Sequence, residues 1–199
     1  MRVGLLGGTF DPPHIGHLIA AQDVLVALGL DRVLFIPAHA PPHKRSRAIT
    51  PAAIRLEMLE AAIGDDARFG VDTLELERKG ISYTVDTLRE LREREPRWEL
   101  YLLLGTDQAR DLGSWREPAE IVRLARLVVM ARDGVASVSL PWPAETVGVT
   151  RIDVSSTGVR NRMAEGRPIR YVVPDGVLRV IEREGLYRTP AATAIEREG

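Results

Sequence analysis

The chain contains no cysteine, no long apolar run and no excess of charge of one sign. The lack of cysteine excludes a disulfide framework, a thiolate zinc site and a cysteine nucleophile. No stretch approaches the roughly 18 consecutive apolar residues of a membrane-spanning helix. Glycine interrupts the apolar segment at residues 1–8 too early for a signal peptide. We therefore expect a cytoplasmic protein with no membrane partner.

Acidic and basic residues balance almost completely. The chain has 27 Lys and Arg against 28 Asp and Glu, which gives a formal net charge of −1. Nucleic-acid-binding domains usually carry a clear positive excess, so we expect no nucleic-acid partner, although a local basic site is still compatible with this balance. With 199 residues, of which 45% are hydrophobic, the chain is long enough to build one domain around its own core.

Hydrophobic periodicity predicts alternating strands and helices. The predicted strands cover residues 2–6, 32–36, 69–77, 99–104, 127–131 and 146–152. The predicted helices cover residues 15–28, 51–63 (with Thr50 as N-cap), 84–95, 118–124, 156–164 and 174–184. This alternation predicts an α/β fold, a doubly wound parallel sheet with helices on both faces, in a single domain over residues 1–188. Residues 189–199 lack an apolar face, and we expect them to form a mobile tail.

Open parallel sheets bind ligands beyond the carboxyl ends of their strands. In this chain the rule selects residues 7–17, 37–47 and 105–115, which follow three of the predicted strands. We therefore look for the functional site in these three segments first.

The first segment, GGTFDPPHIGH at residues 7–17, has features of a phosphate site. Gly7 and Gly8 let the backbone approach a ligand closely, and the following helix offers free N–H groups at its positive end. His14 and His17 are three residues apart and face the same side, and Gly16 is expected to leave room for a flat ligand. The segment lacks the P-loop and dinucleotide fingerprints, and a zinc site would need a third protein ligand. Two glycines also form ordinary tight turns, so both interpretations stay open.

Hydroxyl residues open a second segment, VSSTGVR at residues 154–160. Ser155, Ser156 and Thr157 begin a predicted helix, where hydroxyls and free N–H groups suit an anion. Arg160 follows one turn later and can bind a phosphate through two parallel hydrogen bonds. A plain helix N-cap explains the serines equally well. The loop after the second strand is also basic, because Lys44 lies in a stretch from 32 to 56 that has no acidic residue. Such a loop is either solvated or closes over phosphates.

Two of these segments resemble the nucleotidylyltransferase superfamily. Residues 9–17, TFDPPHIGH, are similar to its HxGH signature, and residues 154–160 are similar to its ISSTxxR motif, with Val154 in place of Ile. The resemblance implies a Rossmann-like fold in which His14, His17 and Arg160 are catalytic. It also implies that ATP is bound by Gly7, Gly8, Thr9, Phe10, Ser155, Ser156 and Thr157.

Segments in the middle of the chain resemble bacterial nicotinate-nucleotide adenylyltransferases. They are PPHK at 41–44, ISYTVDTL at 81–88, GTD at 105–107 and GSW at 113–115, and the resemblance extends over residues 1–187. It implies ATP and nicotinate mononucleotide as substrates, with Mg²⁺ arriving on ATP. The implied roles are Tyr83 and Thr84 at the ring carboxylate, Trp115 stacked on the pyridinium ring, Lys44 as a mobile cation, and Gly105 and Asp107 at the ATP ribose.

The activity implied by this resemblance is adenylyl transfer from ATP to nicotinate mononucleotide, by in-line attack and without a covalent intermediate. Two alternatives stay open. The chain is either an adenylyltransferase for another phosphate ester, such as phosphopantetheine, or a nucleotide-binding sensor without turnover. The residues at 82–84 and Trp115 favour nicotinate mononucleotide as the acceptor, because a phosphopantetheine acceptor needs neither.

Overall fold

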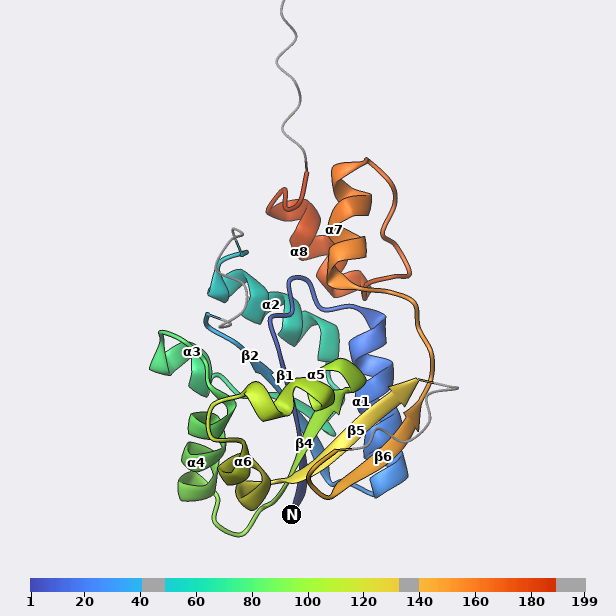
Figure 1. The fold of residues 1–199 in the computed structure, drawn as a ribbon. Coiled ribbons are helices and arrows are strands. Elements are labelled where there is room, and N and C mark those ends of the chain that lie inside the picture. Colours follow the sequence, from blue (N-terminus) through green and yellow to red (C-terminus); the bar gives the residue numbers. More distant parts are fainter. Residues whose placement is uncertain (41–48, 133–139, 189–199) are drawn as a thin grey trace, which may run out of the picture.

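The computed structural model describes residues 1–40, 49–132 and 140–188 and builds them around a six-stranded sheet (Figure 1). The strands are β1 (Arg2–Gly8), β2 (Arg32–Pro37), β3 (Phe69–Val71), β4 (Glu99–Gly105), β5 (Arg126–Arg132) and β6 (Ala144–Val149). Their order is β3-β2-β1-β4-β5-β6, and every neighbouring pair is parallel. The chain reverses its winding between β1 and β4. A doubly wound sheet opens its ligand crevice at this point.

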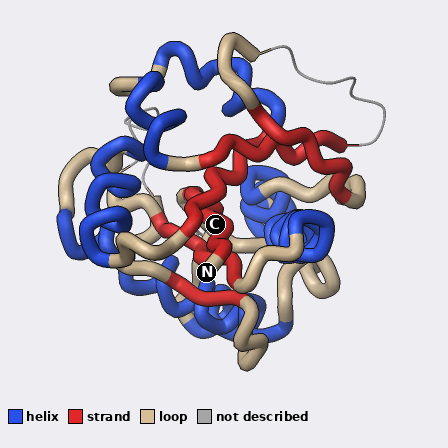
Figure 2. Tube along the Cα trace, turned by 90° about the horizontal axis from the view of Figure 1, so that it is seen from below, coloured by secondary structure: helices blue, strands red, loops and turns tan. Residues whose placement is uncertain are grey.

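Helices cover both faces of the sheet, as the turned view in Figure 2 makes visible. They are α1 (Ile15–Leu28), α2 (Ala52–Ile63), α3 (Leu74–Arg78), α4 (Thr84–Arg94), α5 (Thr106–Asp111), the 3₁₀ turn η1 (Leu112–Ser114), α6 (Pro118–Leu124), α7 (Ser156–Ala164) and α8 (Asp175–Arg183). The first hydrophobic core packs α3, α4, α5 and α6 on one face, and the second packs α1 and α2 on the other.

Strand β4 shows how the sequence builds both layers at once. Leu100, Leu102 and Leu104 belong to the first core, and Tyr101 and Leu103 belong to the second. Successive side chains of a strand point to opposite faces, so a strand covered on both sides reads as a continuous apolar run. Burying one such leucine completely contributes roughly 1.5–3 kcal/mol.

A third core lies past the carboxyl edge of the sheet, where α7 and α8 pack against α2 (Figure 1). Met58 of α2 contributes to it together with Val159 of α7 and Val177 of α8. The Ile15 N–H at the start of α1 donates to the Val172 carbonyl at 3.2 Å. This packing holds the start of α7 beside the start of α1, so two helix N-termini meet above the strand ends.

The predicted α/β class, with a doubly wound parallel sheet and helices on both faces, is confirmed. The strand predicted over 69–77 is wrong beyond Val71, because residues Leu74–Arg78 form α3. Asp72 is the physical reason. Its carboxylate accepts the N–H of Leu74 at 3.1 Å, which turns the chain out of the strand.

Two predicted boundaries also shift. Strand β6 ends at Val149 rather than at 152, because the N–H of Thr150 donates to the Asp23 carboxylate at 2.6 Å. Helix α2 begins at Ala52, and Thr50 does not cap it; its hydroxyl donates to Tyr187 at 3.3 Å instead. The predicted tail at 189–199 lies outside the described residues. Among the helices of the described residues, none combines the length and the apolar character needed to span a bilayer.

Candidate active site

A cavity of about 700 Å³ lies where β1 and β4 end. It is lined by the predicted site residues Gly7, Gly8, Thr9, Phe10, His14, His17, Tyr83, Thr84, Gly105, Trp115, Ser155, Ser156, Thr157 and Arg160. Two predicted residues are not among them: Lys44 lies outside the described residues, and the Asp107 side chain is fully exposed and pairs with Arg110 at 3.6 Å. The fold thus gathers residues that are up to 153 positions apart in the sequence, from Gly7 to Arg160.

His14 and His17 stack on each other at the start of α1. Their ring centroids are 3.7 Å apart at an interplanar angle of 25°, and the Phe10 ring meets His17 edge-on at 5.1 Å. The His14 backbone N–H donates to Nδ1 of His17 at 3.2 Å. An accepting Nδ1 leaves the proton of a neutral imidazole on Nε2. His17 therefore carries a donor on Nε2.

Glycines at two positions make room for these rings. A Cβ at Gly16 would lie 3.1 Å from Nδ1 of His14, so the His14 imidazole already occupies the space over this residue. Gly16 also lines the cavity, and its expected contact with a flat ligand stays a prediction. A Cβ at Gly8 would lie 2.9 Å from the ring of Phe10, which itself has a left-handed backbone with φ of 49°. Only glycine fits at position 8 without displacing this ring.

Helix α7 is fastened to the loop between β1 and α1. The Arg160 guanidinium donates to the Asp11 carbonyl at 2.7 Å and to the Thr157 hydroxyl at 2.9 Å. The Ser156 hydroxyl donates to the Pro12 carbonyl at 2.8 Å. Carbonyl oxygens repel a bound phosphate. The Arg160 and Ser156 side chains occupy two such carbonyls with hydrogen bonds. Arg160 and the two histidines line one cavity with two helix N-termini, which concentrates positive potential there.

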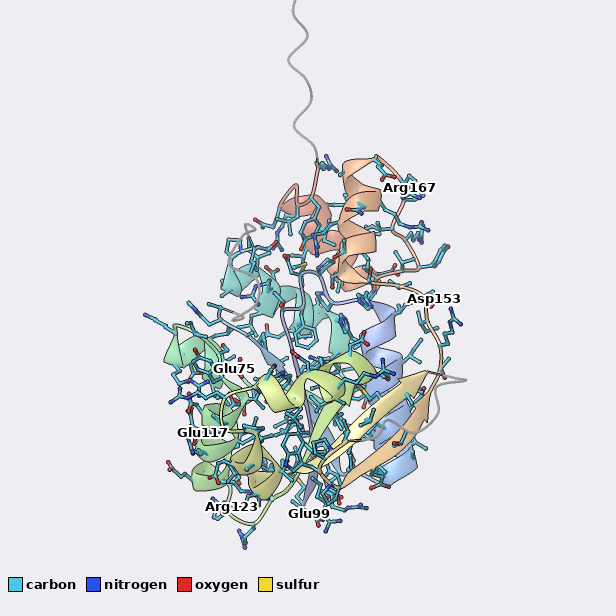
Figure 3. All side chains as sticks on the ribbon, viewed as in Figure 1. Glu75, Glu99, Glu117, Arg123, Asp153 and Arg167 are labelled. Carbon is cyan, nitrogen blue, oxygen red and sulfur yellow. The ribbon has the colours of Figure 1, made fainter. Side chains whose placement is uncertain are left out.

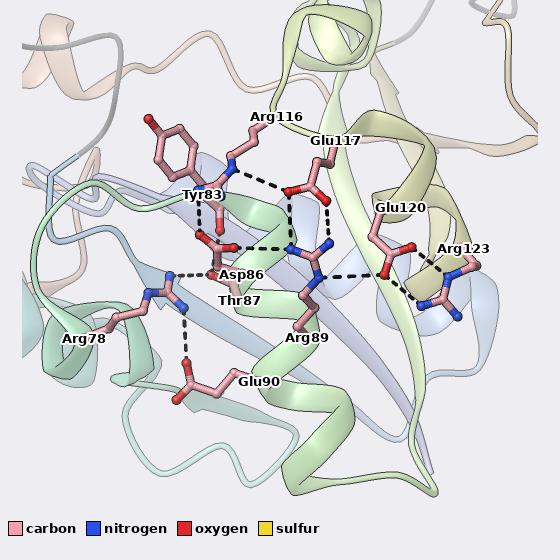
Figure 4. Close-up of polar contacts among 10 residues, drawn as sticks. All are labelled: Arg78, Tyr83, Asp86, Thr87, Arg89, Glu90, Arg116, Glu117, Glu120 and Arg123. Carbon is pink, nitrogen blue, oxygen red and sulfur yellow. Dashed lines mark hydrogen bonds and ion pairs between the residues drawn. The ribbon is translucent and has the colours of Figure 1, made fainter.

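Tyr83, Thr84 and Trp115 line another part of the cavity, where Tyr83 and Trp115 pack against the first core. Thr84 opens α4, where the first N–H groups have no carbonyl partner within the helix. The Arg116 guanidinium lies 5.0 Å from the Tyr83 ring centroid and pairs with Asp86 at 3.3 Å, as Figure 4 shows. These contacts hold the turn that carries Trp115 next to the start of α4.

Comparisons with known proteins agree with this geometry. Residues 5–162 match the cytidylyltransferase-like family model. A probable nicotinate-nucleotide adenylyltransferase of Thermus thermophilus is 47% identical over 188 residues, which cover 94% of this chain and 100% of the relative. A probable nicotinate-nucleotide adenylyltransferase of Geobacillus thermodenitrificans is 42% identical over 193 residues, which cover 97% and 89%. This chain belongs to the nicotinate-nucleotide adenylyltransferase family.

A solved structure shares the fold of this family member. Plasmodium falciparum nicotinic acid mononucleotide adenylyltransferase, complexed with NaAD, aligns with a TM-score of 0.76 over 94% of this chain and 97% of that chain. The two sequences are only 17% identical, so the likeness is one of architecture. The family resemblance that the HxGH, ISYTVDTL and GSW segments predicted is confirmed.

Sequence reasoning missed the role of Arg55 of α2, which contacts the cavity-lining residue Thr9. Its side chain is 1% exposed and donates to the carbonyls of Thr9 at 2.8 Å, Thr50 at 2.9 Å and His39 at 3.3 Å. Burial lowers the pKa of the guanidinium, and the nearby Asp11 carboxylate raises it. Helical spacing was an available signal, because Arg55 lies three residues before the buried Met58 and shares its face.

Glu75 of α3 was missed as well (Figure 3). This carboxylate is buried, lines the cavity and accepts the Thr87 hydroxyl of α4 at 2.6 Å. Nothing in the sequence pointed to it, because the strand predicted over 69–77 hid the helix that carries it. Gln108 also lines the cavity, and its side-chain oxygen accepts the Gly105 N–H at 3.1 Å.

Proposed function

We propose that the protein transfers the adenylyl group of ATP to nicotinate mononucleotide and so forms deamido-NAD and pyrophosphate. One observation carries this proposal. The candidate phosphate-binding residues His14, His17 and Arg160 line the same cavity as Tyr83 and Trp115, which suit a flat cationic acceptor. The family relatives named nicotinate-nucleotide adenylyltransferase support the same assignment.

In the proposed reaction an oxygen of the acceptor phosphate attacks the α-phosphorus of ATP in line. A new P–O bond forms, the bond between the α-phosphorus and its bridging oxygen breaks, and pyrophosphate leaves. The attacking oxygen is already anionic, so the step needs no general base. Catalysis then depends on positioning and on stabilising negative charge. This requirement explains a site that is rich in donors.

Donors for the ATP phosphates follow from the hydrogen bonds at the two helix starts. Nε2 of His17 carries its proton, because Nδ1 accepts. The Ser155 hydroxyl accepts the Gly158 N–H at 3.0 Å and keeps its own proton to donate. The Thr157 hydroxyl accepts from Arg160 in the same way. We assign Ser156 a positioning role, since its proton is engaged by the Pro12 carbonyl.

The acceptor binds near the start of α4 in this proposal. Trp115 stacks on the pyridinium ring, since tryptophan is the aromatic side chain that attracts cations most strongly. The backbone N–H groups around Tyr83 and Thr84 donate to the ring carboxylate. An amide would present its own N–H₂ group to these donors, so the arrangement favours nicotinate over nicotinamide. Gly105 and Asp107 remain assigned to the ATP ribose, and Lys44 to the phosphates.

We expect Mg²⁺ to enter with ATP as part of the substrate. Within the described residues no group of three His, Asp or Glu side chains is placed to hold a metal ion. Mg²⁺ keeps several waters and binds readily to nucleotide phosphates, so a site of this kind suits it. Its contribution is to neutralise phosphate charge.

The test is pyrophosphate release from ATP and Mg²⁺ with three acceptors compared side by side. Nicotinate mononucleotide should react, and nicotinamide mononucleotide and phosphopantetheine should react much more slowly. Reaction with phosphopantetheine alone would identify a different acceptor, and ATP binding without pyrophosphate release would identify a sensor. His17→Ala should lower kcat by about 10²–10³. Gln22→Ala, an exposed change on the same helix, should not.

A further inference from the structure

Tyr187 lies just after α8, yet its side chain reaches Asp11 in the loop that follows β1, 176 positions away in the sequence. Its hydroxyl donates to the Asp11 carboxylate at 2.6 Å and accepts the Thr50 hydroxyl at 3.3 Å. Asp11 is 2% exposed and lines the cavity. The Tyr187 hydroxyl is therefore a contact through which the C-terminal part of the described chain holds a buried carboxylate at the site.

The same Asp11 is joined to the phosphate-binding machinery through its backbone. Its carbonyl accepts the Arg160 guanidinium at 2.7 Å, and Arg160 lines the cavity. The neighbouring carbonyls of Thr9 and Pro12 accept from Arg55 at 2.8 Å and Ser156 at 2.8 Å. The loop is thus held at three carbonyls, whereas Tyr187 holds it by a side chain. A shift of the Asp11 backbone would move the acceptor of Arg160.

The backbone of Tyr187 adopts a conformation that costs energy. Its φ is 61°, in the left-handed region that residues other than glycine disfavour. Such a conformation persists only where the surroundings hold it. Burial, assisted by the bond to Asp11, raises the pKa of the hydroxyl, so Tyr187 keeps its proton as a donor at neutral pH. The strained turn and the protonated hydroxyl serve the same contact.

We propose that Tyr187 is a positioning residue for adenylyl transfer, because its hydrogen bond to Asp11 fixes the loop after β1 and thereby Arg160. The inference rests on the proposed function, in which Arg160 holds the leaving phosphates. Tyr187 itself touches no substrate in this account. It acts through the Asp11 backbone, and its removal should alter catalysis without abolishing the fold.

The experiment compares Tyr187→Phe with Tyr171→Phe. Tyr171 is a matched control, because its backbone is also left-handed, with φ of 70°, and its side chain is 77% exposed. We expect Tyr187→Phe to lower kcat by about tenfold or more, since small displacements of positioned groups have effects of this size. The KM for nicotinate mononucleotide should change less than about twofold, since the acceptor residues lie on α4 and next to η1. Tyr171→Phe should match the parent in both.

A second pair separates positioning from mere stability. In an Arg160→Ala background, Tyr187→Phe should lower kcat by less than about twofold, because residues that act through one another are non-additive. A full tenfold loss in that background, or parent kinetics for the single variant, would overturn the inference. If the parent protein makes no deamido-NAD, the proposed function fails, and ATP affinity is then measured without acceptor. An ATP affinity that Tyr187→Phe leaves unchanged would overturn the positioning role separately.

Discussion

Arg55→Met should strongly destabilise the fold, because Arg55 is a buried charged side chain with three hydrogen bonds to backbone carbonyls. Methionine has a similar length but no donor, so the change removes the hydrogen bonds to the carbonyls of Thr9, Thr50 and His39. Each bond from a charged donor contributes about 1.5–3 kcal/mol. The three do not simply add, because the buried guanidinium also gives up its hydration, the cause of its lowered pKa.

The net loss follows from what is left behind. Three carbonyls lose a donor, and the buried Asp11 carboxylate loses a neighbouring cation. Removing one member of a buried charge arrangement typically costs about 3–5 kcal/mol. We expect a loss of that size from a total stability on the order of 5–15 kcal/mol. Arg55→Lys should lose less, since lysine keeps the charge but not the planar fork.

Urea unfolding followed by tryptophan fluorescence measures this loss. The chain has 3 tryptophans, Trp98, Trp115 and Trp142, and all of them pack against the first core. Arg179→Met on α8 is the control, because Arg179 is exposed, and it should change stability by less than about 0.5 kcal/mol. A loss below about 1 kcal/mol for Arg55→Met would refute the reasoning that its three buried hydrogen bonds stabilise the fold.

Three further predictions concern the site and one surface pair. Gly16→Ala places a Cβ 3.1 Å from the His14 ring and should lower kcat about tenfold with little change in Tm. Gly148→Ala, where a Cβ would meet nothing within 4 Å, should leave kcat unchanged, and steady-state kinetics compare the two variants. Trp115→Ala should raise the KM for nicotinate mononucleotide about tenfold and leave that for ATP nearly unchanged, and an equal rise in both would contradict the stacking role. Arg68 lowers the pKa of Asp66 from 3.8 to about 2, so this pair stabilises the fold fully above pH 3.8 and loses its effect as the pH falls through 2. NMR titration of Arg68→Ala should return the Asp66 midpoint toward 3.8.

The sheet and most of the site were predictable because both depend on local patterns. Apolar runs such as 99–104 predict strands buried on two sides, and strand ends place His14 and Ser155 at one edge. Helix starts rich in hydroxyls and histidines predict anion binding without tertiary information. Tyr83 and Trp115 were expected at the site only from the resemblance to nicotinate-nucleotide adenylyltransferases, and both line the cavity.

The missed features depend on contacts between distant segments. The need for glycine at position 16 could not be predicted from its neighbours, because the orientation of the His14 ring decides what a Cβ there would meet. Glu75 reaches the cavity only because Asp72 turns the chain into α3. Tyr187 meets Asp11 across 176 positions, and no local pattern specifies such a pair. Buried polar contacts of this kind depend on the folded arrangement as a whole.

The most direct test of the account measures two products from one reaction. Purified protein is incubated with ATP, Mg²⁺ and nicotinate mononucleotide, and deamido-NAD and pyrophosphate are quantified together. The account predicts that both accumulate in equal amounts and that omission of the acceptor stops both. Pyrophosphate without deamido-NAD, or neither product from a protein that binds ATP, would contradict the proposed adenylyl transfer.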